Sequence, residues 1–252
     1  MVSFRAMGRA GNFLFEAASS YGYARRNGLE WGVPNWSTHA FWSPIYLQHL
    51  VHPNYNRQED VLLNENGMQY QDIPFRENWR NQNIVLNGYW QSEKYFKEYR
   101  DEIIEKFAFP YTMKEDTCSI QARFGDYLTI PGKHILVEEP YLRSAISYIQ
   151  NETGINKFKV FSDDLNYFKN NFGHIYNFEY STNGDIIQDL IEISCCHSNI
   201  NSSSTFAFWG AWLNRNPEKV VVTQHKWFQD GWAEGSIIAK TQDIIPENWI
   251  KL

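Results

Sequence analysis

Cysteine is scarce in this sequence. The three present, Cys118, Cys195 and Cys196, include two neighbours and no Cys-x-x-Cys pair. An odd number of cysteines argues against a disulfide framework, and the lack of a Cys-x-x-Cys pair argues against a zinc site built on cysteine pairs. A reducing compartment is the simpler fit, so we expect a cytoplasmic protein.

Long apolar runs and an excess of positive charge are missing as well. Residues 1–5 lack the apolar core of a signal peptide, and no run is long and apolar enough to span a bilayer. The formal net charge of −6 at pH 7 gives no general attraction to nucleic acids or anionic membranes. We therefore expect no nucleic-acid partner and no transmembrane segment, and any membrane contact would be peripheral.

Several widespread catalytic motifs are absent too. The chain has no Gly-x-x-x-x-Gly-Lys-Ser/Thr phosphate loop, no His-Glu-x-x-His zinc motif and no Gly-x-Ser-x-Gly nucleophile elbow. It also has no Asp-x-Asp, which disfavours a nucleotide sugar held through a metal. We therefore expect neither a metal site nor a cofactor.

The composition that remains is that of a folded protein. Hydrophobic residues make up 43% of the 252 residues and charged residues 21%, which excludes a disordered chain. Aromatic residues reach 17%, with 10 Trp and 15 Tyr. Aromatic faces often pack against sugar rings, but filling a core explains this content at least as well.

Strand and helix patterns alternate along the chain in two blocks. The first block opens with a strand at 2–6, a glycine-rich turn at Gly8–Asn12, a helix at 13–26 and a strand at 29–33. Between Asn35 and about Asn83 no period is clear, which predicts loops and short elements in an acceptor-facing region. A strand at 84–86 and a helix from Ser92 to Phe107 follow.

The second block shows the same rhythm more clearly. Strands are predicted at 118–122, 158–161, 175–180, 198–201 and 219–223, and helices at 140–153, 165–171, 185–195 and 206–214. Such alternation predicts an α/β fold with parallel, doubly wound sheets. With a linker near residue 115, it indicates two Rossmann-like halves facing across a cleft, 1–115 and 116–252.

Polar residues follow three predicted strands of the second block: Arg123 with Asp126, Asp163 with Asp164, and Ser204 with Thr205. The carboxyl ends of parallel strands meet at one edge, so we expect these groups to converge. An arginine beside a helix start would hold a diphosphate. Each feature has a plainer explanation, a surface turn pair for the arginine and ordinary N-capping for the hydroxyls. Asp189 either accepts hydrogen bonds from a base edge or is an exposed helix residue.

Five motifs, in this order, resemble the bacterial α-1,2-fucosyltransferase family, which is related to the protein O-fucosyltransferases. They are Gly8–Asn12, Gly88–Phe96, Arg123–Tyr127, Phe161–Asp164 and Ser204–Trp212. The resemblance covers nearly the whole chain, and its glycine turn is the least specific part. It implies a GT-B fold that binds GDP-fucose in the cleft without a metal and transfers fucose, with inversion, to a galactose-terminated glycan.

The resemblance also implies roles for individual residues. Arg123 would grip the diphosphate, Asp126 would brace its loop, and Asp163 would be a weaker candidate for a general base, as would Glu16. The set that would contact the donor comprises Arg9, Gly11, Asn12, Ser204, Thr205, Phe206 and, for guanine, Asp189.

Some positions depart from the family pattern. Gln121, placed with the substrate-binding residues, stands where the family has histidine, and Phe124 where it has a second arginine. Phe13 and Glu16 replace glutamines, and Ser203 stands where asparagine is usual. Two other hypotheses therefore remain open: a transferase that uses another nucleotide sugar, and a non-catalytic glycan-binding protein of the same fold.

Overall fold

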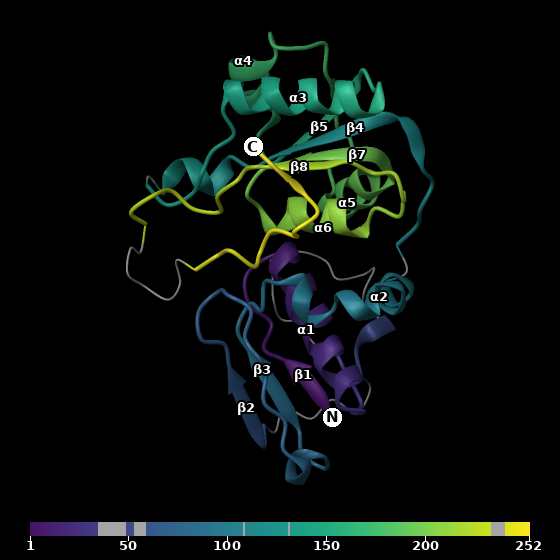
Figure 1. Cartoon of the computed structure of the whole chain (residues 1–252), viewed down its shortest axis with the longest axis vertical. Helices are drawn as coiled ribbons and strands as arrows, with labels where there is room; N and C mark the ends of the chain where they lie inside the picture. Colours follow the sequence, from purple (N-terminus) through teal and green to yellow (C-terminus); the bar gives the residue numbers. More distant parts are fainter. Residues whose placement is uncertain (35–48, 53–58, 108, 131, 233–239) are drawn as a thin grey trace. The chain divides into compact units, whose positions relative to one another are not determined.

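The chain folds into two compact units. The computed structural model describes residues 1–34, 49–52, 59–107, 109–130, 132–232 and 240–252. Unit 1 comprises Met1–Phe109 and Gly235–Pro246, and unit 2 comprises Pro110–Glu234 and Glu247–Leu252 (Figure 1).

Unit 1 is built on a parallel three-stranded sheet. Its strands are β1 (Val2–Phe4), β2 (Val61–Asn64) and β3 (Ile84–Asn87), in the order β1-β3-β2. Its helices are α1 (Ala10–Arg26), α2 (Arg100–Phe107) and the 3-10 helices η2 (Glu77–Trp79), η3 (Glu93–Tyr95) and η4 (Lys97–Tyr99). Because every pairing is parallel, all three strands end at one edge of this sheet.

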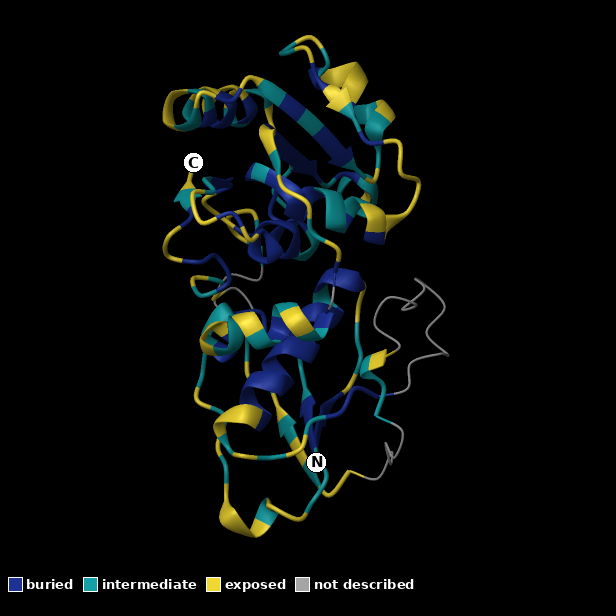
Figure 2. Cartoon of the chain, turned by 90° about the vertical axis from the view of Figure 1, so that its right-hand side faces the viewer, coloured by how far each residue is buried: buried dark blue, intermediate teal, exposed yellow. Residues whose placement is uncertain are grey.

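Helix α1 is buried along most of its length (Figure 2). Several of its residues are small and wholly buried, namely Ala17, Ala18, Ser19, Ser20 and Ala24. Small side chains let neighbouring segments approach a helix closely on several sides, whereas a helix with one apolar stripe is covered on that side alone. The central helix of unit 1 is therefore part of its core rather than a surface layer.

Two expectations for the first block were wrong. Residues 29–33 form isolated bridges from Trp31 and Val33 in place of a strand. The predicted helix from Ser92 to Phe107 is broken into η3, η4 and α2, and the Ser92 Oγ caps η3 by accepting a hydrogen bond from the Lys94 N–H at 3.3 Å. Strand β2, four residues long, is one of the short elements expected between Asn35 and about Asn83. Part of that stretch, residues 35–48 and 53–58, falls outside the described residues.

The boundary between the units differs from the predicted division at 115/116. Strand β4 already begins at Lys114, so the preceding residues belong with unit 2. Near the end of the chain, Asp243 accepts a hydrogen bond from the Tyr70 N–H at 3.0 Å and forms an ion pair with Lys94 Nζ at 2.6 Å. Ile244 and Ile245 are buried beside it in the sequence. These contacts join a late segment of the chain to unit 1.

Unit 2 contains a six-stranded parallel sheet in the order β6-β5-β4-β7-β8-β9. The strands are β4 (Lys114–Ala122), β5 (Lys157–Ser162), β6 (Glu179–Tyr180), β7 (Cys196–Asn201), β8 (Val221–Thr223) and β9 (Ile250–Lys251). The helices are η5 (Gly125–Thr129), α3 (Glu139–Thr153), α4 (Leu165–Phe172), α5 (Ile186–Cys195) and α6 (Thr205–Leu213). Helices α3 and α4 cover one face of the sheet, and α5 and α6 the other (Figure 1). The expected α/β class with a parallel, doubly wound sheet is confirmed, while the facing of two halves across a cleft stays a prediction.

The two faces of this sheet are chemically different. The α3 and α4 side is an apolar core that includes Ile120, Val160 and Leu142. On the other side, Asn199 Nδ2 donates to Ser119 Oγ at 2.8 Å and to the Ile193 carbonyl at 3.0 Å. Buried amides with partners in two strands and a helix allow little slippage, because each lost bond leaves a polar group unsatisfied. These hydrogen bonds therefore fix where α5 lies against the strands.

Candidate functional site

Three neighbouring strands of unit 2 end together. Strands β5, β4 and β7 are adjacent and parallel, with Ala122 opposite Ser162 and Gln121 opposite Asn201. The residues that follow each strand therefore emerge at the same edge of the sheet. The structure thus brings together the Arg123 loop, Asp163 and the residues that precede α6.

The Arg123 guanidinium lies between two carboxylates. Its Nη1 is 3.0 Å from Asp163 Oδ2, and its Nη2 is 2.5 Å from Asp126 Oδ1. Only 18% of the arginine side chain is exposed, so it does not extend into bulk solvent. A guanidinium carries five N–H donors, so these two contacts leave it able to bind a further anion. That anion must compete with Asp126 and Asp163, since the cluster has two negative charges and one positive.

Gly125 makes this arrangement sterically possible. The Phe124 N–H donates to Asp163 Oδ1 at 2.9 Å, which draws the carboxylate against the loop. A Cβ atom on Gly125 would lie 2.1 Å from Asp163 Oδ2, far inside van der Waals contact. The glycine of the Arg-Phe-Gly-Asp-Tyr motif therefore leaves room for the acid that holds Arg123.

The same loop is tied to the segment before α6. Ser202 Oγ donates to Gln121 Oε1 at 2.7 Å and accepts a hydrogen bond from the Arg123 N–H at 3.2 Å. The Tyr127 hydroxyl donates to the Ser203 carbonyl at 3.2 Å. Gln121 is itself buried, so it holds the Ser202 side chain in place and would not contact a ligand directly.

Helix α6 begins without a side-chain cap. Ser204 is the N-cap residue, with extended backbone angles, but its hydroxyl accepts no hydrogen bond from the first turn. Ordinary N-capping by Ser204 therefore does not occur here. Thr205 and Phe206 form the half-buried first turn. The uncapped N–H groups and the positive end of the helix dipole suit an anionic ligand.

Asp189 lies farther along the same sheet. It sits in the first turn of α5, where its Oδ1 accepts hydrogen bonds from Ser181 Oγ and from Asn183 Nδ2 at 3.0 Å. Burial raises the pKa of Asp189 above its ordinary value, although these two hydrogen bonds act against the shift. The half-buried carboxylate is thus held by the loop after β6, two strands from β4. It is not in contact with the Arg123 cluster.

Phe124 is explained by packing. Its ring is fully buried and stacks on Phe172 with centroids 5.9 Å apart, and it also meets Tyr167 at 4.7 Å. The residue that replaces the family's second arginine therefore belongs to the apolar core of unit 2. Arg123 is the one positively charged residue between positions 123 and 130.

The remaining predicted residues, Arg9, Gly11 and Asn12, lie in unit 1. Arg9 precedes α1, Gly11 is buried in its first turn, and Asn12 Oδ1 accepts a hydrogen bond from Gln91 Nε2 at 2.9 Å. This bond links the glycine turn to the Gly-Tyr-Trp-Gln motif after β3. Two of the five family motifs therefore meet at the carboxyl edge of the unit 1 sheet.

Two carboxyl groups lie behind that edge. Glu16 is wholly buried in α1 and accepts hydrogen bonds from the Met7 N–H at 3.1 and 3.2 Å. Burial, and to a lesser extent Glu65, holds the pKa of Glu16 well above its usual range. Burial also raises the pKa of Glu65 to about 7, against two backbone hydrogen bonds. Sequence reasoning missed Glu65, and its one signal was the short apolar run Val61–Leu63 just before it.

Among the described residues, no group of three or more His, Cys, Asp or Glu side chains is placed to hold a metal ion. None of the helices in the described ranges has the length and apolar character needed to cross a membrane.

Comparison with known proteins identifies several relatives. The O-antigen biosynthesis glycosyltransferase WbnK of Escherichia coli is 36% identical over 119 residues, which cover 45% of this chain and 39% of that protein. The alpha-1,2-colitosyltransferase of Escherichia coli is 26% identical over 190 residues, covering 67% of this chain and 62% of that protein. Galactoside alpha-(1,2)-fucosyltransferase 2 of Oryctolagus cuniculus is 23% identical over 245 residues, which cover 84% of this chain and 67% of that protein. The chain thus spans less than two thirds of the first two relatives.

Similarity to solved structures is weaker. POFUT1 in complex with GDP is 10% identical and superposes with a TM-score of 0.42, covering 88% of this chain and 97% of that one. The family model of "Glycosyl transferase family 11", by contrast, matches residues 8–252. The resemblance to fucosyltransferases is confirmed: the chain belongs to glycosyl transferase family 11.

Proposed function

We propose that this protein transfers fucose from GDP-fucose to a hydroxyl of a galactose-terminated glycan, with inversion and an α-1,2 linkage. Membership of glycosyl transferase family 11 supports the reaction class. The names of the colitosyltransferase and galactoside fucosyltransferase relatives support the linkage. GDP-fucose and the glycan are then the two substrates, and the reaction needs no metal.

One observation in unit 2 carries the proposal. A guanidinium and an uncapped helix start emerge from adjacent strands, and Ser202 joins their two loops by hydrogen bonds. A guanidinium offers paired donors to phosphate oxygens, and a helix start offers backbone N–H groups. Together they form a binding site for the diphosphate of a nucleotide sugar.

The charge distribution suggests how the site would assist the reaction. The acceptor hydroxyl attacks the anomeric carbon from the face opposite GDP, through an oxocarbenium-like state as in glycoside hydrolysis. Negative charge then grows on the β-phosphate as its bond to the sugar breaks. Groups already fixed in place stabilise such charge without reorganising, and they usually supply a large share of the rate. Arg123, held by Asp126 and Asp163, and the start of α6 would fill this role.

Substitution of Arg123 tests the proposal. Arg123→Lys should lower kcat with GDP-fucose at least about a hundredfold, the scale of losing one such donor, because a lysine cannot replace a bidentate contact. Arg143→Lys is the matched control, because Arg143 forms an exposed pair with Glu139 on α3. GDP release should be measured against a panel of galactose-terminated acceptors. Near-normal turnover by the Arg123 variant would exclude the assigned role.

A different donor sugar is the second candidate, and the colitosyltransferase relative favours it. Any ligand that binds only the folded protein raises its melting temperature. GDP should therefore raise it more than UDP or CDP at equal concentration if the base pocket selects guanine. Turnover with GDP-fucose compared with other GDP-linked deoxysugars then identifies the sugar.

A further inference from the structure

The loop that follows β4 carries a second feature besides the Arg123 cluster. Tyr127 lies in η5, and His134 lies farther along the loop, before the start of α3. The two rings are nearly parallel, with an interplanar angle of 6° and centroids 3.6 Å apart. This separation is van der Waals contact between two ring faces. The proposed binding of the diphosphate makes no direct use of His134.

Tyr127 connects this stack to both parts of the proposed site. The guanidinium carbon of Arg123 lies 5.6 Å from the centroid of the Tyr127 ring, within reach of a cation–π contact. The Tyr127 hydroxyl donates to the Ser203 carbonyl at 3.2 Å, in the segment that leads into α6. One phenol therefore contacts the arginine through its ring and the helix start through its hydroxyl.

His134 is held in place by the segment that follows β8. An isolated antiparallel bridge pairs His134 with Phe228, and the His134 carbonyl accepts a hydrogen bond from Gln229 Nε2 at 2.8 Å. The Phe228 ring also lies near the imidazole, with centroids 5.6 Å apart. Because its backbone is fixed from this side, the imidazole meets Tyr127 from a defined position.

The same segment is bonded to the residues before α6. Gln224 Oε1 accepts a hydrogen bond from the Ser203 N–H at 2.9 Å, and Gln224 Nε2 donates to the Leu136 carbonyl at 2.9 Å. The Ser203 hydroxyl donates to the Lys226 carbonyl at 2.6 Å. The loops that follow the parallel strands β4, β7 and β8 are thus joined by hydrogen bonds at the carboxyl edge of the sheet.

The imidazole of His134 is neutral at physiological pH. Burial, followed by the positive charges of Lys133 and Arg123, lowers the pKa of His134 to about 4, against the opposing effect of Asp126. Its Nδ1 is shielded from solvent and has no hydrogen-bond partner among the described residues. Stacking, rather than a charge or a hydrogen bond through Nδ1, therefore holds the ring against Tyr127. A neutral ring also adds no repulsion toward the Arg123 guanidinium.

We propose that His134 is a positioning residue for the diphosphate site, because its ring fixes Tyr127, which in turn orients the Arg123 guanidinium beside the start of α6. This inference rests on the proposed function, and it adds to the site a residue that acts through its neighbours. A guanidinium that is oriented before the ligand arrives loses less conformational freedom on binding, which strengthens affinity. A flat, neutral ring at position 134 supplies this orientation without a proton transfer.

His134→Ala removes the ring and tests the proposal. GDP binding is measured by calorimetry, which reports the dissociation constant and the fraction of protein that binds as separate quantities. We expect the affinity for GDP to fall about tenfold, the scale of one aromatic contact, with an unchanged binding fraction. His134→Phe keeps a flat ring and should stay within about twofold of wild type. His174→Ala is the matched control and should bind GDP like wild type, because His174 is 60% exposed and lies 3.3 Å from Glu139 of α3.

Equal GDP affinity in wild type and His134→Ala would overturn the inference. So would a lower binding fraction at unchanged affinity, which is the result expected of a purely structural role. A His134→Phe variant as weak as His134→Ala would also overturn it, since stacking would then not be the property that matters. A wild type that binds no nucleotide would overturn the proposed function, and this inference with it.

His134→Leu is measured if His134→Ala does not fold. Leucine removes the flat ring but leaves less empty volume than alanine, so it should preserve the fold better. It should show the same loss of GDP affinity, about tenfold. Unchanged GDP affinity in this variant would equally contradict the positioning role of the ring.

Discussion

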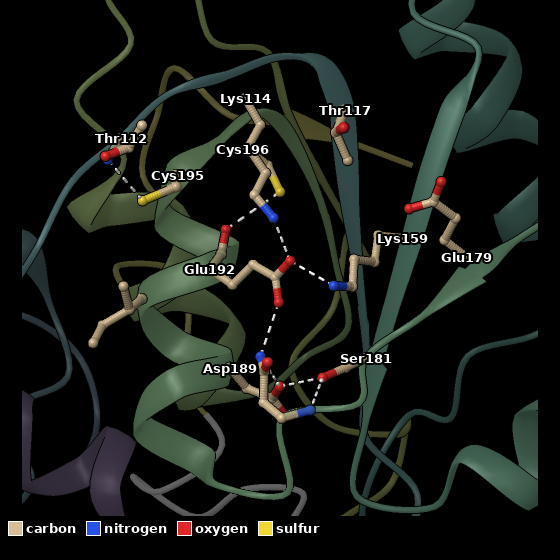
Figure 3. A network of polar contacts seen from close by, with 12 residues as sticks. Thr112, Lys114, Thr117, Lys159, Glu179, Ser181, Asp189, Glu192, Cys195 and Cys196 are labelled. Carbon is tan, nitrogen blue, oxygen red and sulfur yellow. Dashed lines mark hydrogen bonds and ion pairs between the residues drawn. The ribbon is translucent and has the colours of Figure 1, made fainter.

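Replacing Glu192 with glutamine should destabilise unit 2 in a way that depends on pH. Glu192 of α5 accepts hydrogen bonds from Lys114 of β4, from Lys159 of β5 at 2.5 Å and from Asn183 at 2.8 Å (Figure 3). Burial raises the pKa of Glu192, but these bonds outweigh it and hold the pKa at about 2, against an ordinary 4.5. The network therefore stabilises the ionised carboxylate.

The magnitude follows from that shift. One pKa unit corresponds to about 1.4 kcal/mol, so the shift of Glu192 corresponds to about 3 kcal/mol in favour of the folded state. The carboxylate side chain is only 12% exposed, so solvent screening reduces this little. We expect Glu192→Gln to lose about 2–3 kcal/mol at pH 7. Because the folded pKa is the lower one, the difference should shrink as pH falls from about 4.5 and vanish near pH 2.

Equilibrium urea unfolding at a series of pH values measures this difference. Glu179→Gln is the control, because Glu179 is 55% exposed and lies 3.5 Å from Lys157, a contact that should contribute less than about 1 kcal/mol. A Glu192 variant within about 0.5 kcal/mol of wild type at pH 7 would refute the reasoning. So would a deficit that persists unchanged at pH 2, since that would reflect shape rather than charge.

Two further predictions concern the sites themselves. Glu16→Gln should raise the free energy of unfolding relative to wild type above pH 4.5. In wild type the folded protein holds a proton on Glu16 that the unfolded chain releases, so wild type loses stability as the pH rises. The difference should grow by up to about 1.4 kcal/mol per pH unit until Glu16 ionises in the folded state. Melting temperatures at pH 5 and pH 8 measure this, and a wild type that is the more stable at pH 8 would contradict it. Gly125→Ala should push Asp163 away from Arg123. The guanidinium then loses one of the two carboxylates that orient it, so GDP binding should weaken about tenfold, the scale of losing one charged hydrogen bond, even though a competing negative charge also moves away. Calorimetric titration with GDP checks this second prediction, and equal affinity would show that the acid is not needed.

Much of unit 2 could be predicted from the sequence, because the central strands β4, β5, β7 and β8 are largely buried and helices α3 and α5 have clear apolar stripes. The convergence of Arg123, Asp163 and the Ser202–Ser204 segment followed from strand direction alone. Unit 1 was harder to predict from the sequence, because β2 is only four residues long and its residues are at best half-buried. A helix from Ser92 could not be distinguished from three short pieces, because an apolar period does not report a break at Phe96.

The packing of Glu65 against the Gly88–Gln91 turn shows a second limit of prediction. It depends on the positive φ of Trp90 and on Gly88, whose missing Cβ leaves room for the Glu65 side chain, and no periodic pattern encodes either. The paired carboxyl groups come from segments 49 positions apart in the sequence. The role of Gln121 as a brace likewise depends on a partner, Ser202, in another strand's loop.

The path of the last residues has a practical consequence for protein engineering. Gly235–Pro246 completes unit 1, and Glu247–Leu252 then returns to unit 2, where β9 pairs with β8. Neither unit is a single stretch of the gene. A cut after residue 115 would leave residues 1–115 without Asp243, and it would leave residues 116–252 with the Gly235–Pro246 segment of unit 1 and without the first two residues of β4. Chimaeras that exchange a half with a relative must therefore exchange this C-terminal tail as well.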